Sequence, residues 1–373
     1  MVDRFLLSEI RAELDDGKAI IILGTRQVGK STLVKNLPEL ETRKVLQWNG
    51  DDQGIRTLLD SISLAELSEL IGNHDLLIID EAQRFNNIGL IIKQIVDNIS
   101  TCSIIVTGSS SFELKNDINE PLTGRKWEHI LYPLSWSEMV KHHGLLKELS
   151  LLEQRLIYGY YPEIVSTNNK KEKKLNLLAD SYMFKDILNI EKLLKSDKLV
   201  KLLQAIALQI GNLVSYHELA QITGLSSATV EKYIQILESC FIVFRIQCFR
   251  RNIRTELNKS RKIYFYDNGI RNSVINNFNI IELRNDVGAL WENFLMSERK
   301  KYLSYNNIRA NTFFWRTKDQ SEIDYIEESQ GNIHAYEFKY NSDKSRFNTH
   351  FIKTYSPVTT QVIHKSNFHQ WLK

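Results

Sequence analysis

One short segment near the N-terminus has the residue types and the spacing of a loop that binds phosphates. From Gly24 to Ser31 the chain reads glycine, four further residues, glycine, lysine and serine, which is the pattern of a phosphate-binding loop. The glycines let the backbone turn tightly and point its N–H groups at phosphate oxygens. We expect Lys30 to reach the β- and γ-phosphates of ATP and Ser31 to give its hydroxyl to Mg²⁺. The predicted ATP-binding residues are Gly24, Thr25, Arg26, Gln27, Val28, Gly29, Lys30, Ser31 and Thr32.

An acidic pair follows a second apolar segment. Residues 76–79 form a short apolar run that leads into Asp80 and Glu81. Asp80 is predicted to hold Mg²⁺ together with Ser31, and Glu81 to act as the base that orients and polarises an attacking water. Acidic residues also cap helices, so the pair alone indicates little. Together with the phosphate-binding loop it predicts a nucleotide hydrolase, and Glu81 argues against a P-loop kinase.

A third apolar segment, residues 103–106, ends in Thr107, Gly108 and three serines from Ser109 onward. In ATPases that carry the extra glutamate, such a strand lies between the two motif strands, and a polar residue at its tip senses the γ-phosphate. Thr107 and Ser109 both fit this role, and the sequence does not choose between them. The alternative is an ordinary turn in which serine caps the next helix.

Arg125 follows this strand and precedes the apolar-rich segment 130–134. An arginine at this place can neutralise the charge that develops during ATP hydrolysis, either within its own chain or on a neighbouring subunit. A surface arginine with no catalytic role is an equally weighted alternative.

The elements that must position these residues indicate a parallel α/β sheet. Residues 19–23 form a short apolar run, typical of a buried parallel strand. After Ser31, Leu33, Val34 and Leu37 recur at helical spacing. The sequence therefore predicts a helix that begins beneath the phosphates, with its positive dipole end toward them.

Length, charge and cysteine content narrow the class of protein. The chain has 373 residues, enough for two or three domains, and its formal net charge is only +3, so any nucleic-acid site must be a local patch. Cys102, Cys240 and Cys248 show no metal-binding or redox spacing. Cys102 and Cys240 have apolar surroundings in the sequence, and we expect both to be reduced core residues. The chain has no signal-peptide pattern and no run of ~18 apolar residues that could span a membrane. We expect a cytoplasmic protein with no membrane partner.

Residues 197–262 are predicted to form a winged helix-turn-helix. Helical patterns cover residues 199–210, 216–220 and 227–237, with a turn at 223–226 before the third helix, as a helix-turn-helix requires. A strand at 241–246 precedes a basic run. The basic residues are Arg250, Arg251, Arg254, Lys259, Arg261 and Lys262. Such a module can place its third helix in the major groove of DNA and its basic residues on phosphates. The exposed face of that helix carries no arginine, which makes specific reading of DNA bases weak. We therefore consider contact with a protein partner as well supported as DNA binding.

Four residues in the last quarter of the chain have the order of a nuclease site. Glu292 lies on a predicted helix, Asp324 on a strand, and Glu337 and Lys339 on the next strand. Because side chains alternate between the two faces of a strand, Glu337 and Lys339 are expected on the same face. This arrangement resembles the PD-(D/E)xK restriction-endonuclease-like core, which implies that Asp324 and Glu337 hold Mg²⁺ or Mn²⁺, that Lys339 positions a water, and that Glu292 completes the site. A domain of this kind can also keep these residues and only bind DNA.

On these motifs the chain resembles the bacterial and archaeal AAA-type ATPases with a C-terminal domain of unknown function. The resemblance spans most of the chain. It rests on residues 24–31, 76–84, 107–111, 124–125, 133–135, 160–163 and 262–269. It implies binding of ATP, its hydrolysis, and a core able to form homo-oligomers. One departure is Tyr160-Tyr161-Pro162, where relatives commonly carry glycines before the proline, so we expect a stiffer hinge here.

The predicted order of domains is a P-loop ATPase core at 1–155, a helical lid over the nucleotide at 156–196, the winged helix at 197–262 and the nuclease-like α/β domain at 263–373. The leading prediction for function is ATP hydrolysis, with ATP and Mg²⁺ as ligands, coupled to DNA binding or processing. The alternative is a nucleotide-dependent regulatory switch or scaffold whose C-terminal half binds a protein partner.

Overall fold

The computed structural model describes residues 2–109, 121–167, 169–180, 196–249, 260–317 and 319–373. They divide into two compact units. The first comprises Met1–Tyr132 and the short segment Ser239–Phe241, and the second comprises Pro133–Leu188, Leu193–Glu238 and Ile242–Lys373. No helix within the described ranges is long and apolar enough to cross a membrane.

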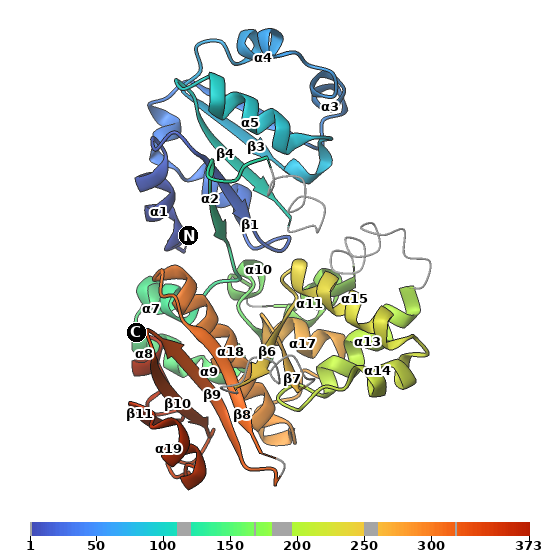
Figure 1. Cartoon of the computed structure of the whole chain (residues 1–373), viewed down its shortest axis with the longest axis vertical. Coiled ribbons are helices and arrows are strands. Elements are labelled where there is room, and N and C mark those ends of the chain that lie inside the picture. Colours follow the sequence, from blue (N-terminus) through green and yellow to red (C-terminus); the bar gives the residue numbers. More distant parts are fainter. Residues whose placement is uncertain (1, 110–120, 168, 181–195, 250–259, 318) are drawn as a thin grey trace. The chain divides into compact units, whose positions relative to one another are not determined.

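The first unit is built on a parallel sheet of five strands in the order β2-β3-β4-β1-β5 (Figure 1). Its strands are β1 (Ala19–Leu23), β2 (Val45–Asn49), β3 (Leu76–Asp80), β4 (Ser103–Gly108) and β5 (Lys126–Ile130). Its helices are α1 (Leu6–Glu13), α2 (Lys30–Lys35), η1 (Pro38–Glu41), α3 (Gln53–Leu59), α4 (Leu64–Ile71), η2 (Ala82–Arg84) and α5 (Ile88–Asn98).

The strand order brings the predicted motifs to one edge of this sheet. β4 pairs with both β1 and β3, and all of these pairings are parallel, which confirms the predicted place of β4 between the two motif strands. Every residue of β1 is buried, as expected for a central parallel strand with both faces covered. Because parallel strands end at the same edge, the residues that follow β1, β3 and β4 meet there.

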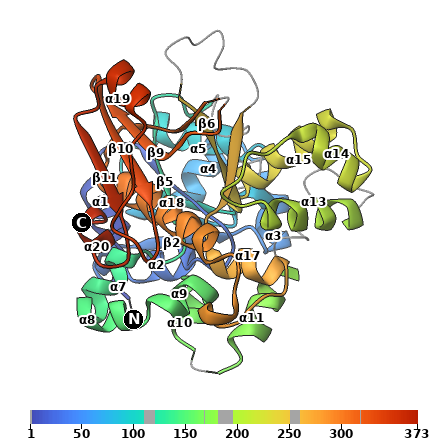
Figure 2. The ribbon, with the colours of Figure 1, turned by 90° about the horizontal axis from the view of Figure 1, so that it is seen from below.

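The second unit contains a mixed sheet of six strands in the order β11-β10-β9-β8-β6-β7 (Figure 2). Its strands are β6 (Val243–Cys248), β7 (Arg261–Phe265), β8 (Asn311–Arg316), β9 (Glu322–Ser329), β10 (Asn332–Phe338) and β11 (Thr359–Ile363). The pairs β6·β8 and β10·β11 are parallel, and the pairs β6·β7, β8·β9 and β9·β10 are antiparallel.

The helices of the second unit precede the sheet, join its strands or, in the case of α20, follow its last strand. They are α7 (Trp136–His143), α8 (Leu145–Ser150), α9 (Leu152–Tyr158), α10 (Pro162–Val165), α11 (Lys171–Leu178), α13 (Ser196–Leu208), α14 (Tyr216–Thr223), α15 (Ser227–Ser239), α17 (Asn268–Val274), η4 (Ile281–Leu283), α18 (Val287–Tyr305), α19 (Thr349–Tyr355) and α20 (Phe368–Trp371).

Three helices form where the helix-turn-helix was predicted, but the strands after them belong to a larger sheet. α14 ends at Gly224, which has a left-handed φ of 63°, and Ser226 caps the start of α15 by accepting the N–H of Thr229 at 3.1 Å. β6, predicted as part of the wing, pairs with β8, and the predicted domain boundary after residue 262 falls inside β7. Pairing across this boundary makes β6 and β7 structural parts of the C-terminal sheet.

The segment predicted as a lid over the nucleotide has other partners in the structure. α9, α10 and α11 lie in the second unit, and α9 and α11 pack against α17. Asn272 of α17 donates to the carbonyl oxygens of Leu156 and Ile157 at 3.2 and 2.8 Å, and Asp267 accepts the N–H of Tyr160 at 2.6 Å. These buried polar contacts satisfy the backbone at the end of α9 and so hold it to α17. Residues 168 and 181–195 of the predicted lid lie outside the described residues.

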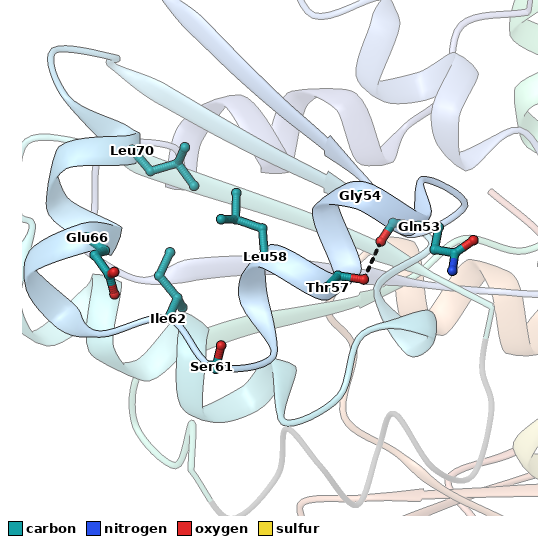
Figure 3. A pocket seen from close by; sticks show the side chains of 8 residues that line it. All are labelled: Gln53, Gly54, Thr57, Leu58, Ser61, Ile62, Glu66 and Leu70. Carbon is teal, nitrogen blue, oxygen red and sulfur yellow. Dashed lines mark hydrogen bonds between the residues drawn. The ribbon is translucent and has the colours of Figure 1, made fainter.

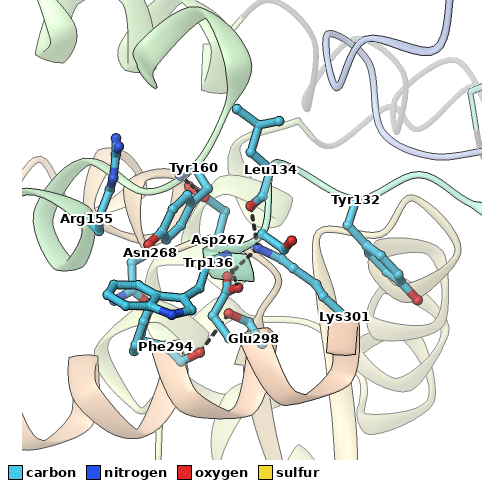
Figure 4. A network of polar contacts seen from close by, with 12 residues as sticks. Tyr132, Leu134, Trp136, Arg155, Tyr160, Asp267, Asn268, Phe294, Glu298 and Lys301 are labelled. Carbon is cyan, nitrogen blue, oxygen red and sulfur yellow. Dashed lines mark hydrogen bonds and ion pairs between the residues drawn. The ribbon is translucent and has the colours of Figure 1, made fainter. Parts of the chain in front are cut away.

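A buried ion pair holds the chain where the second unit begins. Lys301 and Glu298 of α18 are almost completely buried, and their charged groups lie 2.6 Å apart. Lys301 Nζ donates to the carbonyl oxygen of Leu134 at 3.1 Å, and Glu298 accepts the N–H of Trp136 at 2.7 Å (Figure 4). Burial raises the pKa of Glu298, although Lys301 opposes this. α18 therefore fixes the backbone of residues 134–136 through charged side chains.

Cys102 and Cys240 are buried, as predicted, and Cys248 is buried as well; none of the three is part of a disulfide. Burial raises the pKa of the Cys102 thiol to about 11, so this thiol stays protonated and unreactive at neutral pH.

Candidate functional site

The phosphate-binding loop follows β1, and at two places its backbone conformation or close packing requires a glycine. Gly24 has a φ of 156°, and a Cβ atom placed on it would lie 2.2 Å from the carbonyl oxygen of Leu131. Gly29, which precedes α2, has a φ of 96°, in the region that side chains other than glycine avoid. Both glycines are therefore required by the fold of the loop, and the sequence pattern has a local structural cause.

Lys30 lies inside this loop. Its side chain is 6% exposed, and its ammonium donates to the carbonyl oxygens of Gly24 and Thr25 at 2.8 and 2.9 Å. Arg4 supports the loop from outside, because its guanidinium donates to the carbonyl oxygens of Val28 and Tyr132 at 2.8 and 2.6 Å. The loop thus presents a positive charge among backbone N–H groups, which suits phosphate.

Asp80, at the end of β3, joins the loop to the tip of β4. Its carboxylate accepts the hydroxyl of Ser31 at 2.8 Å and also the hydroxyl of Thr107. The backbone N–H of Glu81 donates to the same carboxylate at 3.2 Å. Three predicted site residues that are up to 76 positions apart, from Ser31 to Thr107, therefore meet at one carboxylate.

The donors present at this point fit Mg²⁺. Ser31 offers a hydroxyl oxygen and Asp80 a carboxylate oxygen in direct contact, and Mg²⁺ in nucleotide sites takes such hard oxygens together with waters and substrate phosphates. Among the residues that the structure describes, no group of three or more His, Cys, Asp or Glu side chains could hold a metal by itself. A cation shared with the phosphates of a nucleotide agrees with this donor set.

Glu81 follows directly and has an unusual backbone. Its φ and ψ are 52° and 46°, a left-handed conformation that is uncommon for a residue with a side chain. Its side chain is partly exposed, and Gln83 donates to it at 2.5 Å. A carboxylate of this kind can accept a proton from water.

The two candidates at the tip of β4 differ in their contacts. Thr107 is 1% exposed and donates to Asp80, whereas the backbone N–H of Ser109 donates to Gln83 at 3.2 Å. Ser110 and Ser111 lie outside the described residues.

Arg125 lies at the other end of the sheet from the phosphate-binding loop. Its carbonyl oxygen accepts the N–H of Ala19, the first residue of β1, whereas the loop follows the last residue of β1. β1 is five residues long, so the two places are about 16 Å apart along the strand. The guanidinium pairs with Asp97 at 2.6 Å. Arg125 therefore cannot reach a nucleotide in its own loop. A role across a subunit interface and a surface arginine with no catalytic role both remain for it.

A hollow of about 820 Å³ lies beside α3 and α4, away from these residues (Figure 3). Its lining residues are Gln53, Gly54, Thr57, Leu58, Ser61, Ile62, Glu66 and Leu70. None of them is a predicted site residue, and Glu66 is engaged in the capping box of Ser63. The ATP chemistry is therefore assigned to the edge of the sheet and not to this hollow.

In the second unit, the structure brings Asp324, Glu337 and Lys339 together. Lys339 Nζ lies 3.2 Å from Glu337 and 3.7 Å from Asp324, and Asp324 accepts the N–H of Phe338 at 2.7 Å. Burial and the neighbouring charge of Asp324 raise the pKa of Glu337 to about 7.

A buried lysine completes this cluster, and its burial corrects the prediction that placed Lys262 in an exposed basic run. Lys262 of β7 is 1% exposed, lies 2.9 Å from Glu292, and also pairs with Glu322. Burial alone would lower the pKa of Lys262, but Glu292 and Glu322 raise it. Tyr264 donates to the same carboxylate of Glu292 at 2.5 Å. The sequence signal for a buried ion pair was a lysine directly before the apolar run of residues 263–265.

This C-terminal cluster does not fit a divalent metal as it stands. Lys262 and Lys339 occupy the carboxylates that the nuclease interpretation assigns to the metal, and the part of the chain that the structure describes has no three-ligand group for one. No metal-dependent step is therefore derived at this cluster.

Three segments of the chain match known family models. Residues 16–140 match a model described as an AAA domain, residues 149–280 one described as a domain of unknown function (DUF8612), and residues 287–372 another domain of unknown function (DUF4143).

Relatives of this chain come from bacteria and archaea. An uncharacterized protein of Mycobacterium tuberculosis is 22% identical over 346 residues, which cover 91% of this chain and 74% of the relative. An uncharacterized protein of Methanocaldococcus jannaschii is 24% identical over 351 residues, which cover 81% of this chain and 73% of the relative. Among solved structures, the Walker-type ATPase of Pyrococcus abyssi superposes with a TM-score of 0.52 at 16% identity and covers 74% of this chain and 96% of that chain. Residues 16–140 are thus similar to an AAA domain, and the fold over about three quarters of the chain is similar to that of a Walker-type ATPase.

Proposed function

We propose that this protein binds ATP with Mg²⁺ at the loop of residues 24–32 and hydrolyses it to ADP and phosphate. The observation that carries the proposal is the meeting of Ser31, Asp80 and Thr107 at one carboxylate, with Glu81 as the next residue. A phosphate-binding loop alone needs only Lys30 and its backbone. The added acidic pair gives both a metal ligand and a base.

Each residue has a distinct role in this proposal. Lys30 binds the β- and γ-phosphates, and Ser31 and Asp80 hold Mg²⁺, which when bound neutralises charge on the phosphate oxygens. Glu81 accepts a proton from the water that attacks the γ-phosphorus, as the bond to the leaving β-phosphate oxygen breaks. Thr107 or Ser109 contacts the γ-phosphate from the tip of β4.

We further propose that hydrolysis is coupled to DNA through α13, α14 and α15. Residues Ser227, Lys232 and Gln235 of α15 are exposed and suit contact with a DNA groove. Arg261 is committed elsewhere, since it stacks 3.9 Å over the ring of Tyr216 and lies 3.6 Å from Glu231. Lys262 of the same predicted basic run is buried and paired with Glu292, and Arg250, Arg251, Arg254 and Lys259 lie outside the described residues.

The alternative function is a nucleotide-dependent switch or scaffold whose second unit binds a protein. ATP turnover measured with no DNA, with single-stranded DNA and with double-stranded DNA separates the two. Stimulation by DNA supports coupling to DNA. A turnover that DNA does not change, together with a stably co-purifying protein, supports the switch.

The C-terminal cluster argues against metal-dependent cleavage of DNA, because Lys262 and Lys339 already pair with its carboxylates. We expect plasmid DNA incubated with the protein in Mg²⁺ or Mn²⁺, with and without ATP, to stay intact. Cleavage that disappears in Asp324→Ala would contradict this and support the nuclease prediction. Because ATP is bound in the other unit, ATP turnover of Asp324→Ala should equal that of the unaltered protein.

A further inference from the structure

We propose that Gln83 is a positioning residue for ATP hydrolysis, which holds the carboxylate of Glu81 and links it to the tip of β4. The inference rests on the proposed function, in which Glu81 is the base. Gln83 lies in η2, two residues after Glu81, and the loop and acid-pair patterns do not specify it.

Both ends of the Gln83 amide are engaged. Nε2 donates to Oε2 of Glu81 at 2.5 Å, and Oε1 accepts the backbone N–H of Ser109 at 3.2 Å. Ser109 is 8% exposed and directly follows β4. One side chain therefore connects the proposed base with the strand tip that is predicted to contact the γ-phosphate.

The amide of Gln83 satisfies both neighbours. An ionised carboxylate can only accept hydrogen bonds, and a backbone N–H can only donate one. The side chain between Glu81 and Ser109 must therefore present a donor at one end and an acceptor at the other. This pairing also fixes which end of the amide is nitrogen. A methionine offers neither group, and an ionised glutamate offers two acceptors.

The backbone of Glu81 is held independently of Gln83. The N–H of Gly50 donates to the carbonyl oxygen of Asp80 at 2.8 Å, and a Cβ on Gly50 would lie 2.3 Å from the carbonyl oxygen of Glu81. This close packing fixes the left-handed backbone of Glu81. The side-chain torsions of Glu81 are not fixed by this packing, and the hydrogen bond from Gln83 orients its carboxylate.

Holding the carboxylate leaves it able to act as a base. A carboxylate has about four lone-pair sites, so one hydrogen bond from Gln83 leaves the second oxygen available to water. Because Ser109 sets the position of the amide, a γ-phosphate contact at the tip of β4 also sets the position of the base. Gln83 thereby aligns the base with the bound phosphate.

The first test compares Gln83→Met with the unaltered full-length protein. Met has a similar length and no hydrogen-bonding amide, so we expect kcat for ATP to fall about 10-fold or more, as part of the factor of ~10² to 10⁴ that a placed base supplies. ATP affinity, measured by titration with a fluorescent ATP analogue and Mg²⁺, should change less than about twofold, because uniform binding does not depend on the base. Gln94→Met is the matched control, since Gln94 is exposed on α5.

The second test uses the pH dependence of Gln83→Glu. At pH 8 two carboxylates would face each other at the former hydrogen bond, and they would repel. When the new glutamate is protonated, it can donate to Glu81 as the amide does. We therefore expect the kcat of Gln83→Glu, relative to the unaltered protein, to rise as the pH falls from 8 to 6.

These measurements separate the possible failures. A kcat of Gln83→Met within twofold of the unaltered protein overturns the inference, as does a parallel loss of ATP affinity, which indicates a structural role. A relative kcat of Gln83→Glu that is flat with pH overturns it as well. If the unaltered protein binds no ATP, the proposed function is wrong, and the inference about Gln83 is then wrong as well.

Discussion

Replacing Lys30 by methionine should remove most ATP affinity. The structure places the ammonium inside the phosphate-binding loop, 6% exposed and bonded to the carbonyl oxygens of Gly24 and Thr25. In the nucleotide complex it would instead donate to phosphate oxygens. A hydrogen bond that involves charged groups contributes about 1.5–3 kcal/mol, so the loss of two amounts to roughly 3–6 kcal/mol. At about 1.4 kcal/mol per tenfold change, the lower half of that range predicts an ATP affinity reduced roughly 10²- to 10³-fold.

The assay is an equilibrium titration of each variant with a fluorescent ATP analogue in Mg²⁺. Lys35→Met is the matched control, since Lys35 is exposed on the same helix α2 and should bind ATP as the unaltered protein does. Thermal unfolding of both variants shows that the fold is intact. An affinity of Lys30→Met within threefold of that of Lys35→Met would refute the assignment of the loop.

Three further predictions concern hydrolysis, assembly and stability. Glu81→Gln should retain ATP affinity and lower kcat by roughly 10²- to 10⁴-fold, because the amide cannot accept a proton; an unchanged rate in a turnover assay would leave Glu81 without a catalytic role. If Arg125 acts across a subunit interface, Arg125→Ala should be inactive alone and should regain ATP turnover when mixed with Lys30→Met protein. Full activity of a monomeric Arg125→Ala protein at every dilution rules this out. Lys301→Met should lower the free energy of unfolding by about 3–5 kcal/mol at pH 8, because it leaves Glu298 buried without its cation. The pKa of Glu298 is already raised by burial, so the folded state binds a proton more readily than the unfolded state, and the loss should shrink as the pH falls toward 5. Equal losses at both pH values in urea titrations would contradict that reasoning.

The sequence by itself determined the first unit and most of its candidate site. The loop at residues 24–31 and the acidic pair are contiguous motifs, and each follows an apolar run long enough for a strand. Parallel strands end at one edge, so the meeting of Ser31, Asp80 and Thr107 followed from the order of the strands alone. The local sequence was enough to predict each motif, because the residues of one motif are neighbours in the chain.

The tertiary structure decided the partners of side chains that are distant in sequence. The pairing of β6 with β8, which joins the helix-turn-helix segment to the C-terminal sheet, depends on hydrogen bonds between strands more than 60 residues apart, from Cys248 to Phe314. The same pairing carries Lys262 to Glu292 and Glu322.

Residues at the ends of strands show the same limit within the first unit. Arg125 follows β4 in sequence, yet it lies directly before β5, and its guanidinium pairs with Asp97. Gln83 joins Glu81 to Ser109. Spacing along the chain does not state at which end of a strand a residue lies or which side chain faces it. Those facts depend on strand direction and register, which form only when the sheet is assembled.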